Sequence, residues 1–407
     1  MQEELNQGEQ VQPGAEPAKS QPSAGGPEPK LSAFSGLSGN EMFCVDLIGY
    51  KPGNLLVGNS IFSMGVLGGL KSLGRGFIGG EVKSFTEMIA EGRRLSFERL
   101  AGEMESNNAH GVSGVGSELV FHGTNAEFLS IGSALHAKNQ ASGQAFTSSS
   151  DGQELFCQVD VGYEPKSFVF GNVAYSIGVS RGITGAFKKL VKGEVRQYTE
   201  IFTSTRNLAL QRITDEAKAA GANAVVGIRT SILPYGTTGV QEMVMIGTAS
   251  THALADHARP GGVITSDLTA EEMWNVAKMG YMPQQLVIGT SVYSVGFVGG
   301  FKSFLRGFVK GEITEMTQLI YGAREESLKK VQAQADELGA DDVLGLRTYI
   351  YSLGGGLIEF LVIGTAVKKV EGIKTRSEQL PPQAIIRDKD TFVNRVVYGV
   401  DLNMQGA

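Results

Sequence analysis

Charged side chains recur at fixed intervals along this chain of 407 residues, and they are the first candidates for chemistry. Three positions carry a charge in every copy of a repeated segment: Glu81, Glu194 and Glu312; Arg93, Arg206 and Arg324; Glu127, Glu242 and Glu359. A catalytic role would need a nucleophile with a base beside it, and nothing of that kind accompanies the charges. We therefore predict structural ion pairs, no catalytic residue and no enzyme.

The place of the arginine indicates what it pairs with. Arg324 lies four residues after Ile320 and four before Leu328, hence on or beside the apolar stripe of a helix. A guanidinium there requires a partner, and a carboxylate from its own or a neighbouring unit fits best. Such ion pairs would fix helix to sheet, or subunit to subunit.

Histidine and cysteine are the second source of chemistry, because zinc and copper sites need such ligands at characteristic spacings. The histidines are His110, His122, His136, His252 and His257. They are scattered, and the third copy holds neither histidine nor cysteine. We interpret them as surface or capping residues. No cofactor is predicted, and a metal ion is the alternative.

A glycine-rich loop interleaves basic and apolar side chains. Its residues in copies one and three include Leu70, Phe77, Phe301, Lys302, Phe304, Arg306 and Phe308. Gly74, Gly76 and Gly79 spell G-x-G-x-x-G, but the strand and helix context of a dinucleotide site is missing. Two interpretations stay open: the apolar residues are buried between subunits, which we favour, or the loop lies on an anionic membrane surface.

The elements that position these residues are repeated as whole domains. Gly58, Gly171 and Gly289 are separated by 113 and then 118 residues, and the charged set keeps similar intervals. Solenoid repeats span only about 20 to 50 residues, so each unit is a domain of its own. We predict a disordered tail at 1–38, domains at 39–136, 151–252 and 268–370, and a degenerate fourth leading helix at 385–400.

Each domain is predicted to run from a short leading helix through a Gly-Tyr-x-Pro turn to a strand, the glycine-rich loop, a long helix and two strands. The first strands are expected at 55–63, 168–176 and 286–294. Asn108, Gly221 and Gly339 are expected to end the long helices as left-handed caps. The fold class is α+β, with three tandem β-α-β-β domains joined by short helical linkers. So small a sheet leaves one face and two edges uncovered, which favours assembly with neighbours.

Composition limits the partners. A formal net charge of -6 argues against general nucleic-acid binding, which needs a clustered positive surface. A signal sequence and an apolar run of the ~20 residues that span a bilayer are both lacking, so we expect a cytoplasmic protein. Cys44 and Cys157 occupy equivalent positions in two copies, which indicates two apolar core residues rather than a disulfide.

Several repeated segments resemble a known family. Residues 221–229 and 246–249, with Gly171 and Arg206 upstream, are similar to the YbjQ-like family, which is named for heavy-metal binding. Residues 339–347 and 364–367 match it as closely, whereas residues 108–114 of the first copy are the most diverged. The resemblance implies a dodecin-like α+β subunit that assembles into pentameric rings.

Three domains per chain cannot fill one five-membered ring with whole chains. If five-fold rings hold, five chains would build three stacked rings, and the alternative is a ring of mixed copies with another domain number. We therefore predict a non-enzymatic, self-assembling protein that acts as a scaffold or binding module. The alternative function is a heavy-metal-binding or membrane-surface-associated protein.

Overall fold

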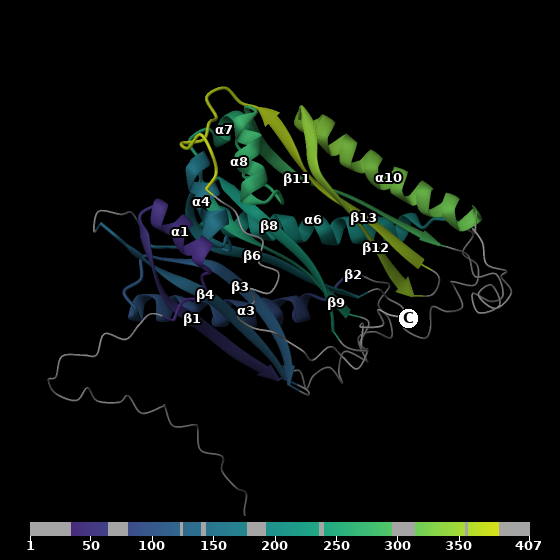
Figure 1. Cartoon of the computed structure of the whole chain (residues 1–407). Coiled ribbons are helices and arrows are strands. Elements are labelled where there is room, and N and C mark those ends of the chain that lie inside the picture. The colour runs from purple at the N-terminus through teal and green to yellow at the C-terminus, as the bar shows by residue number, and fades with distance from the viewer. Residues whose placement is uncertain are drawn as a thin grey trace, which may run out of the picture. The chain divides into compact units, whose positions relative to one another are not determined.

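The computed structural model of the chain describes residues 34–63, 80–122, 125–139, 144–176, 193–235, 240–294, 314–354 and 357–381. Residues 1–33 and the predicted fourth leading helix at 385–400 lie outside this part of the chain. The described residues form an α+β fold of three similar units, each a small sheet packed against one long helix (Figure 1). The predicted fold class is confirmed.

Each unit runs leading helix, strand, long helix, strand, strand. Unit one consists of α1 (Gly39–Leu47), β1 (Tyr50–Ser63), α3 (Lys83–Ser106), β3 (Gly111–His122) and β4 (Asn125–Ala137). Unit two consists of α4 (Gly152–Val161), β6 (Glu164–Ser176), α6 (Arg196–Ala219), β8 (Ala224–Pro234) and β9 (Val240–Thr251). Unit three consists of α8 (Ala270–Lys278), β11 (Tyr281–Ser294), α10 (Thr314–Leu338), β12 (Asp342–Gly354) and β13 (Leu357–Lys369). A one-turn helix, α7 (Ala255–Ala258), precedes α8.

Short strands widen the predicted three-stranded sheets. They are β2 (Gly80–Glu81), β5 (Phe146–Thr147), β7 (Gly193–Glu194) and β10 (Ile264–Thr265). The strand orders are β1-β4-β3-β5, β10-β8-β9-β6-β2 and β12-β13-β11-β7. β5 and β10 pair parallel with β3 and β8, and they belong to the connections that follow β4 and β9 and lead to the next unit. β2 and β7, in contrast, each join the sheet of the next unit.

The long helices alternate with the sheets. α3 packs on β1 and β4 of its own unit and also contacts β6 of unit two. α6 likewise packs on β6 and β9 and contacts β11 of unit three. Figure 1 shows α3, α6 and α10 following one another in this order. Each of the first two helices therefore has a sheet on both sides, its own and that of the next unit.

The hydrophobic core is shared between units for the same reason. One cluster joins Phe202 and Ile213 of α6 to Ile288 and Leu361 of unit three. A second cluster joins residues of the three leading helices. Both cysteines belong to it as buried free thiols, as predicted, and burial raises the pKa of Cys44 to about 11.

Two predicted boundaries are wrong. The first strands β1, β6 and β11 begin four or five residues before their predicted starts, at Tyr50, Glu164 and Tyr281. The proline of each Gly-Tyr-x-Pro motif lies inside the strand, at an irregularity of the β-ladder where its missing N–H is tolerated. The tail predicted at 1–38 also extends too far, because the Phe34 carbonyl accepts a hydrogen bond from Leu55 at 2.6 Å and Ser38 caps α1.

The predicted helix ends are confirmed. Asn108, Gly221 and Gly339 follow α3, α6 and α10 with φ angles of 49°, 69° and 58°. These are left-handed conformations that satisfy the last helical carbonyl groups. The chain can therefore reverse directly into the second strand of each unit.

The glycine at the middle of each first strand allows the long helix to approach closely. A Cβ atom added at Gly58, Gly171 or Gly289 would lie well under 3.0 Å from a carbonyl oxygen of the facing helix. These oxygens belong to Ser96, Ala209 and Ser327. The repeated glycine thus sets the distance between helix and sheet, and with it the place of the side chains on the helix.

We expect Gly58→Ala to destabilise the protein by about 1–3 kcal/mol, because backbone atoms must move to make room for the new methyl group. Urea denaturation would measure the change. Gly102→Ala is the matched control, since Gly102 is exposed on α3 with no atom within 4 Å of an added Cβ. It should stabilise the helix by about 1 kcal/mol. Equal effects of the two substitutions would contradict the close-approach argument.

Candidate functional site

Among the residues that the structure describes, the most buried charges lie where one unit meets the next. Arg93 of α3 donates from Nε and Nη2 to the two carboxylate oxygens of Glu242 on β9, at 3.2 and 2.8 Å. The side chains are only 1% and 0% exposed. The hydroxyl of Tyr235 also donates to Glu242, at 2.9 Å, and Arg93 donates to the Ser117 hydroxyl at 2.8 Å. Both carboxylate oxygens of Glu242 and all three guanidinium nitrogens of Arg93 are thus hydrogen-bonded, as a buried ion pair requires.

The same pair recurs one unit later. Arg206 of α6 donates from Nη2 to both carboxylate oxygens of Glu359 on β13, each at 2.9 Å. Its guanidinium carbon lies 4.9 Å from the ring centre of Tyr175 and 5.4 Å from that of Phe202. Burial alone lowers the pKa of Arg206, but the Glu359 carboxylate more than offsets this, so the guanidinium stays charged. Each arginine therefore pairs with the following unit and not with its own.

Backbone contacts accompany each ion pair. The N–H groups of Val82 and Val195, just before α3 and α6, donate to the carbonyls of Ala174 and Val292 at 2.8 and 2.7 Å. In return, Ala174 and Val292 donate their own N–H groups to threonine hydroxyls of the preceding unit. The acceptors are Thr86 and Thr199. These bonds continue the pairing of β2 with β6 and of β7 with β11.

A second set of charges crosses the same interfaces. Arg212 donates to Glu81 at 2.7 Å, and Lys330 lies 3.5 Å from Glu194. Both basic side chains also donate a hydrogen bond to a carbonyl oxygen on the first strand of their own unit. Sequence analysis missed this position, although Arg99, Arg212 and Lys330 keep the intervals of 113 and 118 residues. The repeat alone could have identified it as a fourth charged position.

The remaining predicted ion-pair residues behave differently. Arg324 is exposed on α10, and the described residues supply no carboxylate that pairs with it. Glu127 is 18% exposed and accepts hydrogen bonds from Asn59 and His122, which lower the pKa of its carboxyl. Glu312 lies outside the described residues, as do the loop positions Leu70, Phe77, Phe301, Lys302, Phe304, Arg306 and Phe308.

The described histidines and cysteines do not fit a metal site. His252 accepts from the Leu254 N–H at Nδ1, and its Nε2 lies 3.2 Å from the Val161 carbonyl oxygen, so both nitrogens are engaged. Burial raises the pKa of both thiols, whereas a metal ligand must be deprotonated. Within the described ranges, no group of three or more His, Cys, Asp or Glu side chains is placed to hold a metal ion.

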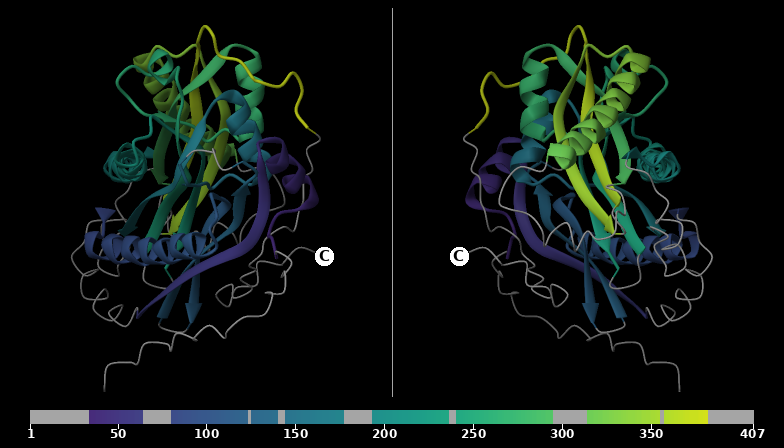
Figure 2. Two further views of the ribbon diagram at one scale, coloured as in Figure 1. Left: turned by 90° about the vertical axis from the view of Figure 1, so that its left-hand side faces the viewer. Right: turned by 90° about the vertical axis from the view of Figure 1, so that its right-hand side faces the viewer.

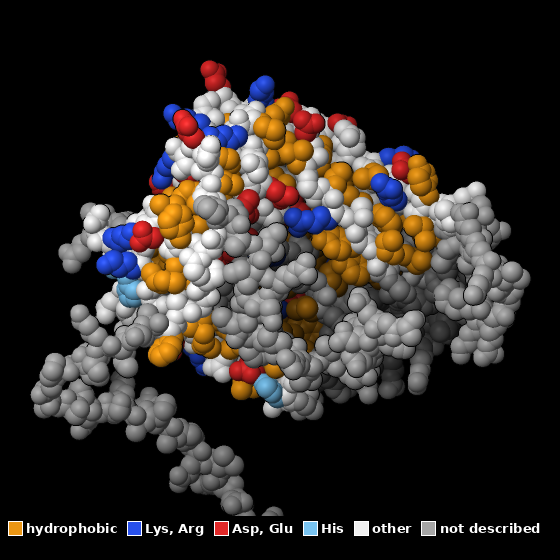
Figure 3. All heavy atoms as spheres, viewed as in Figure 1, with side chains coloured by type: hydrophobic (Ala, Val, Ile, Leu, Met, Phe, Trp, Pro, Cys, Tyr) orange, Lys and Arg blue, Asp and Glu red, His pale blue; other side chains and the backbone are white. Residues whose placement is uncertain are grey.

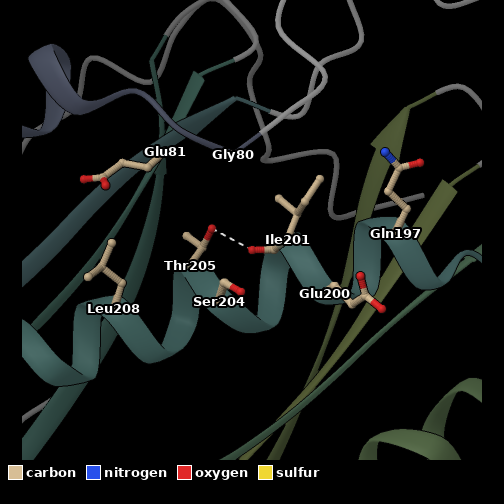
Figure 4. A pocket seen from close by; sticks show the side chains of 8 residues that line it. All are labelled: Gly80, Glu81, Gln197, Glu200, Ile201, Ser204, Thr205 and Leu208. Atoms are coloured by element: carbon tan, nitrogen blue, oxygen red, sulfur yellow. Dashed lines mark hydrogen bonds between the residues drawn. The ribbon is translucent and has the colours of Figure 1, made fainter.

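A hollow of about 370 Å³ lies along α6, beside β2 (Figure 4). Its lining includes the carboxylates of Glu81 and Glu200 with Gln197 and Ser204, while the Thr205 hydroxyl donates back to the Ile201 carbonyl at 2.9 Å. The lining residues include neither histidine nor cysteine. None of the helices in the described part of the chain is long and apolar enough to cross a membrane.

A glutamate of α6 shows how the units have diverged. Glu216 accepts the Phe170 N–H at 2.8 Å, and burial raises the pKa of its carboxyl to about 7, against the opposing effect of that N–H. Unit three has Gln334 at this position, which accepts from the Ile288 N–H and donates to the Ile288 carbonyl at 2.7 Å. The amide satisfies both backbone groups without a buried charge.

Comparison with known proteins places units two and three in a family. Residues 162–253 and 276–370 match the family described as "Putative heavy-metal-binding". The UPF0145 proteins of Vibrio campbellii and Thermotoga maritima are each 43% identical, over 88 and 91 residues. These matches cover 82% and 85% of the relatives but only 21% and 22% of this chain. Each such relative therefore corresponds to about one unit.

A longer match covers more than one unit. The Encapsulin nanocompartment protein Rv1762c of Mycobacterium tuberculosis is 30% identical over 233 residues. The match covers 56% of this chain and 87% of the relative. Tandem units are thus shared with at least this relative.

We expect Glu359→Gln to destabilise the protein by about 3–5 kcal/mol, because Arg206 would remain buried without its counter-charge. Glu326→Gln is the control, since Glu326 pairs with Lys329 at an exposed site and should change stability by under about 0.5 kcal/mol. The double substitution Arg206→Met with Glu359→Leu should come closer to the wild type than Glu359→Gln. Denaturation curves that place Glu359→Gln beside the control would contradict a buried pair.

Glu216 makes stability depend on pH. Its folded pKa is raised from 4.5 to about 7, so its contribution is fully present below 4.5 and is lost as pH rises through about 7. Glu216→Gln should remove this loss and make the protein more stable by about 1–3 kcal/mol above pH 8, with little difference below pH 5. Thermal melting at both pH values measures this. A constant difference across pH would show that the carboxyl does not titrate as expected.

Proposed function

Because this chain belongs to the YbjQ-like family, we propose that it is a non-enzymatic, self-assembling protein whose copies associate through their units. The observation that carries the proposal is the double occurrence of one contact set, around Arg93 with Glu242 and around Arg206 with Glu359. A surface that binds the following unit twice within one chain is suited to bind another copy as well. The assembly would act as a scaffold or binding module.

The name of the relative that matches over 233 residues supports an assembly role. That relative is an encapsulin nanocompartment protein, and this chain covers 87% of it. By extension, we propose that this chain is also a component of a protein assembly, and not the catalyst of a reaction. The catalytic set that an enzyme would need was not found in the sequence, and the charges at the unit interfaces are engaged with one another.

Ring formation is the finer part of the proposal. A contact that joins different surfaces of two units closes into a ring if the rotation closes, and otherwise extends into a filament. Two arrangements of the chains are open. In the first, five chains form three stacked rings. The contacts between consecutive units favour the other, in which one chain contributes three neighbouring positions to a ring of mixed copies.

We expect the purified full-length chain to have a solution mass that is a multiple of 43.2 kDa and larger than one chain. Light scattering coupled to size exclusion measures this, and electron microscopy of the same particles would reveal ring order and stacking. A chain that stays monomeric at all concentrations would contradict the proposal. Stoichiometric metal in elemental analysis of the same sample would favour the alternative, metal-binding function.

A further inference from the structure

We propose that unit three of one chain binds unit one of a second copy, through the same contacts that join units one and two and units two and three. This inference rests on the proposed self-assembly and names its interface. The two internal interfaces each use a long helix of one unit and the first strand of the next. Among the described residues, this leaves one helix surface without a partner unit, on α10, and one such strand surface, on β1.

No described part of the chain covers the helix surface of unit three as α3 and α6 are covered. Arg93 and Arg206 are 1% and 0% exposed in their internal interfaces, whereas their equivalent Arg324 is exposed. Ile320 is only partly buried, although its equivalents Ile89 and Phe202 are buried. The right-hand view of Figure 2 shows α10 in front of its sheet, with no described element over it.

The strand surface of unit one is likewise exposed within the part of the chain that the structure describes. Val57 and Ile61 on β1 are 41% and 60% exposed. The equivalent side chains are at most 8% exposed in units two and three: Phe170, Ala174, Ile288 and Val292. The preceding unit covers those four residues. β1 is also the edge strand of its sheet, while β6 and β11 each carry a short strand added by the unit before.

A second apolar position on unit three fits β1. Val115 and Ile228 are buried, and they belong to clusters with Phe170 and Ile288 of the following unit. Their equivalent in unit three, Leu346 on β12, is 47% exposed. Figure 3 shows hydrophobic side chains gathered on the face between α10 and β12. By the repeat, Leu346 would meet Val57 of the second copy.

The unused charges are complementary. Glu242 and Glu359 are buried against the arginine of the preceding unit, whereas the described residues place no arginine of another unit against Glu127 of unit one. It accepts hydrogen bonds from His122 and Asn59 and keeps 18% of its side chain exposed. The exposed Arg324 at the other end of the same chain is the cation that the repeat would place beside it. The occupant that fits both surfaces is thus a second copy of this chain.

Charge reversal tests the interface in the full chain. Arg324→Glu and Glu127→Arg should each weaken association at least about a hundredfold, because each sets like charges against one another in a buried site. Combined in one chain, they re-create an opposite pair and should restore the wild-type mass. Lys329→Glu is the control, since Lys329 and its equivalents Glu98 and Gln211 are all exposed.

Mass measured by light scattering over a wide concentration range decides the outcome. Dissociation of both single variants, with recovery in the double variant, supports the interface, whether the wild type forms a discrete ring or a growing filament. A wild-type oligomer that all four variants leave unchanged overturns the interface while the proposed self-assembly stands. A wild type that is monomeric throughout overturns both. Unchanged thermal melting of monomeric variants would separate lost association from misfolding, because Arg324 is exposed.

Discussion

The buried arginine–glutamate pair between consecutive units is the constraint on which the arrangement depends. Taking two charges out of water costs several kcal/mol per ion, and their attraction offsets this only if the geometry is close to ideal and further hydrogen bonds are made. The pair of Arg93 and Glu242 meets this condition, because Ser117 accepts from the arginine and Tyr235 donates to the glutamate. A shifted or rotated neighbour would leave a charge buried alone. The pair therefore selects one orientation of each unit relative to the next.

The glycine at the centre of each first strand supports this geometry from within a unit. Because Gly171 has no side chain, α6 lies close on its own sheet, with the carbonyl of Ala209 against the strand. Arg206, one turn earlier on the helix, then points across to Glu359 of unit three. Close packing inside one unit and ion pairing between units are thus two results of a single helix position.

Much of the fold follows from the sequence, because it is written in repeated local signals. The fixed intervals reveal three units, and Asn108, Gly221 and Gly339 mark the helix ends through a backbone conformation that few residues adopt. The charged positions could be identified in the same way, but their partners could not. Whether Arg93 meets a carboxylate of its own or of the next unit depends on the packing of two domains, and the spacing of Glu127 and Glu242 is equally compatible with both.

Other features leave no local signal at all. β2 and β7 are two residues long, too short to display an alternating pattern, and they exist only because the neighbouring sheet offers an edge. The early start of β1 was hidden by Pro52, which reads as a turn residue but lies in the strand at an irregularity. Tertiary context decides such cases.

The replacement of Glu216 by Gln334 in the next unit has a consequence for how such a protein can change. In an assembly of identical single units, every substitution appears in every unit at once. Joining three units in one chain gives each unit its own codons, so the contact between helix and first strand can lose a buried carboxyl in one unit while another unit keeps it. Each unit of this chain can therefore be tuned, by evolution or in the laboratory, independently of the others.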